Sequence, residues 1–149
     1  MDLRPLLALF LLLVTLSARA EPEPTTHFTD QQLIDILKED GYASVKPYKE
    51  NVLLIKIEGR SLLLFNNDDG DLQAYYGASG VKVNYEDINE WNRDHRLSRA
   101  YLDTELDPVL EADLMSNAGL LPKHVTEFFS VFRQSVELFR AFLLKRDRS

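Results

Sequence analysis

Residues 52–65 read VLLIKIEGRSLLLF, two short apolar runs on either side of the polar turn Glu58-Gly59-Arg60. Apolar runs of this length, bounded by turn residues, are typical of β-strands, and the short turn predicts that the two strands form a hairpin. Because the apolar residues follow one another almost without interruption, we expect both strands to be central in a sheet and covered on much of both faces. The rest of the chain is interpreted outward from this hairpin.

The segments next to the hairpin extend the sheet. Residues 44–48 predict a weaker strand, which Pro47 confines to an edge because proline cannot donate a ladder hydrogen bond. Residues 66–71 read NNDDGD and lead into a further strand over 72–76. A calcium-binding loop with Gly70 at its sixth position would need a ligand where Phe65 stands and a glutamate where Tyr76 stands. The acidic loop therefore indicates a turn.

Helical signals mark three segments. Residues 30–40 follow a capping box formed by Thr29 and Gln32, and a second helix begins after the cap residue Asn84. Pro122, a favoured first helical residue, starts a long helix that reaches about Lys145 along a stripe rich in phenylalanine. The inward stripe of the second helix consists of Ile88, Trp91, Asn92 and His95.

Two strands with strict alternation lie between the second and third helices. The alternation predicts that Leu102 lies opposite Leu110, with residues 105–107 as a three-residue turn. This register would place Arg99 opposite Asp113. The resulting order α-ββββ-α-ββ-α predicts an α+β fold, in which helices pack on an antiparallel sheet.

The first twenty residues predict export. An apolar run of about 11 residues is shorter than the ~20 that a membrane-spanning helix needs. It ends in Ala18-Arg19-Ala20, a pattern that signal peptidase accepts, so we expect residues 1–20 to be a signal peptide cleaved between Ala20 and Glu21. Residues 21–27 are interpreted as a flexible linker and 28–146 as a single domain, periplasmic or secreted. Retention of the segment as an anchor is the alternative; after cleavage we expect no stable membrane insertion.

Composition narrows the classes of function. The net charge of −7 repels phosphate backbones, which argues against a nucleic-acid partner. The chain has no cysteine, which excludes thiol catalysis and thiolate metal sites. Its three histidines lie in separate segments without zinc-ligand spacing, and no nucleophile accompanies His95. We therefore expect no metal, no cofactor and no catalytic machinery.

One set of segments is more specific: INEWNR at 88–93, RAYLD at 99–103 and DPVLEADL at 107–114. This combination resembles the YbjN family, also called bacterial sensory transduction regulators, and the resemblance extends from about Phe28 to Leu143. The chain departs from the family's commonest members in its export signal. It also carries Leu121, a poor helix cap, just before Pro122.

The resemblance implies a small α+β domain similar to the chaperones of type III secretion, often dimeric, that works by contact with a protein or peptide. The family has no established reaction, so the resemblance transfers no catalytic residue. On this interpretation Trp91 and Leu102 belong to the core, while Asn92 and His95 satisfy buried backbone groups. The residues expected on a polar interaction surface are Arg99, Tyr101, Asp103, Glu111 and Asp113.

The alternative hypothesis, from a different class, is a periplasmic hydrolase that uses carboxylates such as Asp103, Asp107 or Glu111. The two hypotheses differ in a visible feature of the fold. Two carboxylates that converge in a concave pocket would favour the enzyme, because a raised pKa requires burial. A flat polar sheet face with an exposed apolar strip would favour binding.

Overall fold

The computed structural model describes residues 22–149. The predicted signal peptide and its cleavage site between Ala20 and Glu21 lie outside these residues. The elements, in chain order, are α1 (Asp30–Glu39), β1 (Ser44–Lys49), β2 (Val52–Ile57), β3 (Arg60–Asn66), β4 (Leu72–Gly77), α2 (Tyr85–Asp94), β5 (Arg99–Leu102), β6 (Pro108–Leu114) and α3 (Pro122–Arg146). This order confirms the predicted α+β fold.

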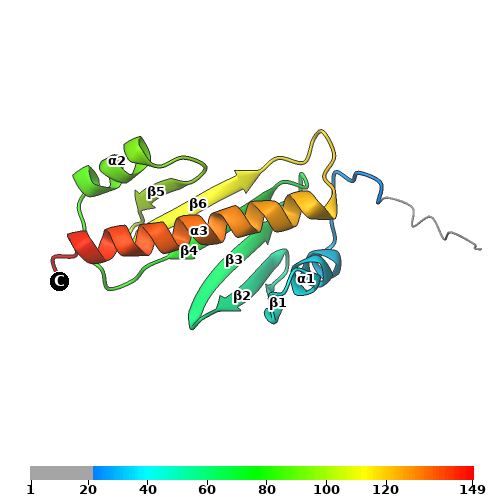
Figure 1. Cartoon of the computed structure of the whole chain (residues 1–149), viewed down its shortest axis with the longest axis horizontal. Helices are drawn as coiled ribbons and strands as arrows, with labels where there is room; N and C mark the ends of the chain where they lie inside the picture. Colours follow the sequence, from blue (N-terminus) through cyan, green and yellow to red (C-terminus); the bar gives the residue numbers. More distant parts are fainter. Residues whose placement is uncertain (1–21) are drawn as a thin grey trace, which may run out of the picture.

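The six strands form one sheet in the order β1-β2-β3-β4-β6-β5, and neighbouring strands are antiparallel throughout. β1, which contains Pro47, lies at one edge as predicted, and the short β5 lies at the other. α3 crosses the sheet, with α1 beside one end of the strand order and α2 beside the other (Figure 1). No helix among residues 22–149 is long and apolar enough to span a membrane.

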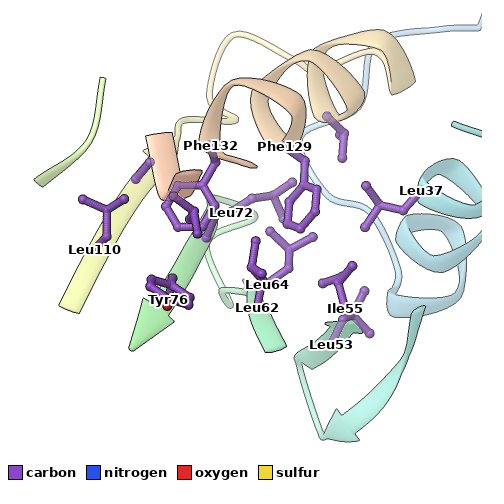
Figure 2. Packing of buried hydrophobic residues seen from close by; sticks show 14 of the residues in the cluster. Leu37, Leu53, Ile55, Leu62, Leu64, Leu72, Tyr76, Leu110, Phe129 and Phe132 are labelled. Carbon is purple, nitrogen blue, oxygen red and sulfur yellow. The ribbon is translucent and has the colours of Figure 1, made fainter. Parts of the chain in front are cut away.

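The core lies between α3 and one face of the sheet. Leu53, Ile55, Leu62 and Leu64 point from the central hairpin toward the phenylalanines of α3 (Figure 2). Each of these four leucine or isoleucine side chains is at most 1% exposed. Their burial anchors the hairpin, since full burial of one such side chain stabilises a fold by about 1.5–3 kcal/mol.

Local signals set the helix ends. The Thr29 hydroxyl accepts a hydrogen bond from the Gln32 amide, and the Gln32 side chain accepts one from the Thr29 amide, which completes the predicted capping box of α1. Leu121 gives α3 no side-chain cap. The ring of His124 compensates, because its Nδ1 accepts a hydrogen bond from the Leu121 amide at 3.0 Å.

The expectation that the central hairpin is covered on much of both faces is wrong in part, because on the face away from the helices Val52 is 3% exposed whereas Leu54, Leu63 and Phe65 are only half-buried. The buried cluster contains Leu53, Ile55, Leu62 and Leu64 but not their neighbours on the opposite face of the sheet. The three helices all contribute to this one cluster. Leucine is apolar whichever face it occupies, so an apolar run does not reveal how many faces are covered.

The predicted register of the β5–β6 hairpin is also wrong, by two residues. Arg99 lies opposite Glu111, and Leu102 opposite Pro108. The faces are nevertheless as predicted, because a shift of two residues preserves the alternation. The turn lies one residue earlier than expected, because the Asp103 amide donates to the Asp107 carbonyl at 3.0 Å, and one carboxylate oxygen of Asp103 accepts hydrogen bonds from the amides of Glu105 and Asp107, both at 2.9 Å.

The second half of the predicted linker is tied to the domain. Thr25 pairs with Leu120 through two backbone hydrogen bonds of 2.9 and 2.7 Å. Gly70 packs against the same segment, where an added Cβ atom would lie 1.9 Å from the Thr26 carbonyl oxygen. This close approach, together with a φ of +89°, explains the glycine at the turn between β3 and β4.

Candidate functional site

The face of the sheet opposite the helices carries a row of apolar side chains, which we call the open face. Leu54, Leu63 and Tyr75 lie next to one another across β2, β3 and β4. Phe65 packs edge-on against Tyr75, with the ring centroids 6.2 Å apart. All four side chains are half-buried, and none belongs to the core cluster of the described residues. The row is therefore apolar surface that residues 22–149 leave uncovered.

Charged residues stand at both ends of this row. Lys46 lies opposite Leu54 on β1, and Lys56 follows on β2; both are exposed. At the other end, Glu111 on β6 lies opposite both Tyr75 and Arg99. An apolar strip with charged ends is the anatomy of a protein interface, where a polar rim surrounds a hydrophobic centre.

Glu111 is a buried charge on the open face, and both of its carboxylate oxygens accept hydrogen bonds. Its side chain is 8% exposed and is held by Arg99, whose guanidinium donates to it at 2.5 Å. The Tyr101 hydroxyl donates to the other carboxylate oxygen at 2.6 Å. Burial of the phenol and this bond to Glu111 raise the pKa of Tyr101 above its usual value, so the hydroxyl remains a donor at physiological pH. Three of the predicted surface residues thus form one cluster.

The two other candidate carboxylates, Asp103 and Asp107, lie at the two ends of the turn between β5 and β6. Asp103 caps that turn through the amides described above, and Asp107 accepts a hydrogen bond from the Gly80 amide at 3.3 Å. Burial raises the pKa of Tyr75, and Asp103, Glu111 and Asp107 raise it further, so the three carboxylates lie near one phenol. None of the three lines the hollows beside α1, α3 or the end of β6, which other side chains form.

Asn92 closes the free edge of β5. Its side-chain amide donates to the Ala100 carbonyl at 2.9 Å, and its carbonyl oxygen accepts from the Ala100 amide at 2.8 Å. These are the two bonds that a neighbouring strand would make to the same residue. The expectation that Asn92 satisfies backbone groups is confirmed, although the side chain is exposed. Asn92 thereby ends the sheet on this side.

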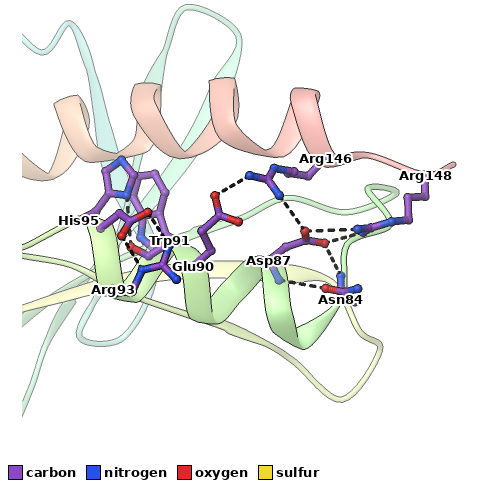
Figure 3. A network of polar contacts seen from close by, with 9 residues as sticks. Asn84, Asp87, Glu90, Trp91, Arg93, His95, Arg146 and Arg148 are labelled. Atoms are coloured by element: carbon purple, nitrogen blue, oxygen red, sulfur yellow. Dashed lines mark hydrogen bonds and ion pairs between the residues drawn. The ribbon is translucent and has the colours of Figure 1, made fainter.

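Trp91 and His95 lie beneath α3 (Figure 3). Trp91 is fully buried, which confirms the predicted core position, and packs edge-on against Phe139 of α3. His95 follows the last residue of α2, and its ring stacks on Trp91 with the centroids 3.6 Å apart. One His95 ring nitrogen contacts the Trp91 carbonyl at 3.2 Å. Both residues therefore position α2 rather than form part of the open face.

A network that the sequence analysis missed ties the C-terminus to α2 (Figure 3). Asp87, at the third position of α2, is buried and receives hydrogen bonds from Arg148, while Arg146 lies 3.6 Å away. Arg146 also pairs with Glu90. The bond from Arg148 holds the pKa of the Asp87 carboxyl below its usual value. The capping signal at Asn84 was visible in the sequence, whereas no local pattern indicates that Arg146 and Arg148 reach Asp87.

Comparison with known proteins identifies the family. Residues 29–145 match YbjN, described as "Putative bacterial sensory transduction regulator". This chain belongs to the YbjN family. No curated protein and no solved structure matches it. The likeness of YbjN to type III secretion chaperones therefore stays a prediction for this chain.

The residues of the YbjN resemblance divide into two groups in the structure. Trp91, Asn92 and His95 build the scaffold around α2, whereas Arg99, Tyr101 and Glu111 form the charged end of the open face. Asp113 lies beside Gln73 and accepts a hydrogen bond from its amide at 3.0 Å. Leu102 is half-buried and packs against the core, as expected. In this chain the residues of the YbjN signature thus contribute both to packing and to the surface.

No group of histidine and acidic residues that could hold a metal ion occurs within residues 22–149. The acidic turn between β3 and β4 has a structural task instead. Asp71 accepts hydrogen bonds from both the amide and the hydroxyl of Ser116, at 2.7 and 3.0 Å. These bonds join the turn to the loop before α3, a contact between distant segments that no local pattern indicates.

Proposed function

We propose that this YbjN protein is an exported, chaperone-like interaction module that acts by binding a protein or peptide partner on its open face. The observation that carries the proposal is the uncovered row Leu54, Leu63, Phe65 and Tyr75. Adjacent apolar side chains that remain half-exposed on a sheet are costly in water, and patches of this kind commonly mark interaction sites. Two of the four are aromatic, the residue type that contributes most binding energy at interfaces.

The charged ends of the row support recognition rather than catalysis. The Arg99 side chain is 65% exposed and is held by Glu111, so its guanidinium is presented in one orientation with little ordering cost on binding. Lys46 and Lys56 are exposed at the opposite end of the row. A partner with complementary charges would be oriented by these ends and bound by the apolar centre.

Export is part of the proposal. The apolar leader and the pattern Ala18-Arg19-Ala20 favour delivery to the periplasm or beyond it. The absence of cysteine fits a domain whose stability comes from packing rather than from disulfides in an oxidising compartment. The partner would then be another exported protein.

Site-specific cross-linking tests the open face. A photoreactive phenylalanine analogue replaces Leu63 in one chain and Leu138, which is 57% exposed on α3, in the control. Both chains are expressed in the native cell and irradiated. We expect a discrete adduct to one partner from position 63 and none from position 138. Adducts from position 138 alone, or from neither position, would contradict the proposal.

A further inference from the structure

A groove lies where the N-terminal half of α3 passes over the end of β6. Its volume is about 380 Å³. The side chain of Leu97 stands at its mouth and is 70% exposed. Asp113 and Glu127, both exposed, also line it, although the Asp113 carboxylate lies on the open-face side of the sheet beside Gln73; no lysine or arginine lines the groove. The apolar lining consists of Leu97, Ala112, Leu114, Leu120, Phe128, Val131 and Phe132.

The sheet has a free edge beside this groove. β5 begins at Arg99 opposite Glu111, whereas β6 continues to Leu114, so β6 runs past its neighbour (Figure 1). The chain before β5 turns away at Leu97, whose φ is +66°. Among residues 22–149, no strand lies beside Ala112–Leu114 on the β5 side.

The backbone groups at this edge are available for pairing. Pro108 directs its carbonyl toward Ala78 on the β4 side, with a bond of 2.9 Å. Alternate residues of an antiparallel strand direct both backbone groups to the same neighbour. Leu114 therefore turns toward β4, and Asp113 turns its amide and carbonyl toward the free edge. Asn92 closes the corresponding edge of β5, but no side chain in the described part of the protein plays that role at Asp113.

We propose that an extended peptide segment of a protein partner adds to the sheet here as a short strand beside Asp113 and Leu114. Residues directly opposite in an antiparallel pair share a face. A residue opposite Asp113 would thus lie beside its carboxylate, which selects lysine or arginine. Its neighbour, opposite Leu114, would point to the helix side and enter the apolar groove. The segment recognised is therefore one that alternates basic and apolar residues.

The groove of this edge site is separate from the apolar row of the open face. The groove lies on the helix side of the sheet, lined by α3, whereas Leu54, Leu63, Phe65 and Tyr75 lie on the other side. The edge site thus provides a second point of attachment. Substitutions in the groove leave the row intact, and substitutions in the row leave the groove intact, so either proposal can fail alone.

A defined peptide tests the edge site. The probe is a fluorescein-labelled octapeptide of alternating leucine and lysine. The protein is purified in the form that the cell accumulates and is titrated into the peptide, and fluorescence anisotropy measures binding. One control peptide has glutamate in place of lysine, and the other has proline at a central leucine. We expect the lysine peptide to bind and each control to bind at least ten-fold more weakly, because one loses the charge pairing and the other cannot pair as a strand.

Two matched leucines provide the protein variants. Leu97 and Leu106 are both exposed and both have a positive φ, of 66° and 64°, where asparagine is tolerated. We expect Leu97→Asn, which removes apolar lining without adding charge, to weaken binding of the lysine peptide at least ten-fold and Leu106→Asn to leave it unchanged. Asp113→Lys should reverse the preference in favour of the glutamate peptide.

Several results would overturn the proposal. These are absence of binding, equal binding of the proline peptide, equal effects of the two leucine variants, and no change of preference in Asp113→Lys. Sedimentation of the same variants identifies other occupants. A dimer of the chain that Leu97→Asn dissociates would assign the groove to a second copy, and weaker binding by a chain that retains residues 1–20 would assign it to the leader. Leu63→Glu should leave peptide binding unchanged.

Discussion

Replacing Asn92 by alanine removes the two side-chain bonds that close the edge of β5. A neutral hydrogen bond contributes about 0.5–1.5 kcal/mol to stability, so the pair is worth about 1–3 kcal/mol by the same measure. Because Asn92 is exposed, water can reach the freed Ala100 groups, and we expect a loss in the lower half of that range.

Asn89→Ala is the matched control. Asn89 is exposed on the same helix and gains the same helix propensity, up to ~0.7 kcal/mol, when it becomes alanine. The difference in free energy of unfolding between the two variants therefore isolates the contact with Ala100. In urea, with a slope of about 1–3 kcal/mol per M, the midpoint of Asn92→Ala should lie roughly 1 M below that of Asn89→Ala.

The same variant has a second expected effect. A free strand edge can pair with another chain, so Asn92→Ala should also form more self-associated species in sedimentation velocity. Equal urea midpoints for the two variants would refute the reasoning about edge closure. In that case the bonds to Ala100 would contribute nothing beyond what water supplies.

Four further predictions follow from the described contacts and the leader. Trp91→Ala should lower the free energy of unfolding by about 3–5 kcal/mol in thermal unfolding followed by circular dichroism, because Trp91 is fully buried. Folding lowers the pKa of the Asp87 carboxyl, so the ionised group stabilises the folded protein at any pH above its unfolded pKa of about 4. This stabilisation is lost as pH falls from there through the lower pKa of the folded state. The higher stability of the unmodified protein relative to Asp87→Asn should therefore disappear as pH falls below about 4. Tyr101→Phe leaves one Glu111 oxygen without its donor and should cost about 1–3 kcal/mol in urea unfolding. Intact mass of the protein from its native envelope should give an N-terminus at Glu21, and a chain that still begins at Met1 would contradict export.

The open face could be only partly predicted from the sequence. Alternation placed Arg99, Tyr101 and Glu111 on one face correctly, because side-chain direction in a strand has a period of two residues. The same rule could not choose between registers two residues apart, and the choice fell to the Asp103 cap in the turn. Leu54 and Leu63 were expected to be covered, because an apolar run cannot indicate how many layers pack on it.

The sequence by itself determined the elements and their ends. The capping boxes at Thr29 and Asn84, the proline that starts α3 and the turn at Glu58-Gly59 all act within four residues, where chain connectivity already brings the groups together. Only the tertiary structure decided which face of the sheet the helices cover. It also decided that β6 extends beyond the end of β5 and that Arg146 and Arg148 contact Asp87. The contact between Arg148 and Asp87 alone joins residues 61 apart. These features depend on the packing of whole elements, which no local periodicity encodes.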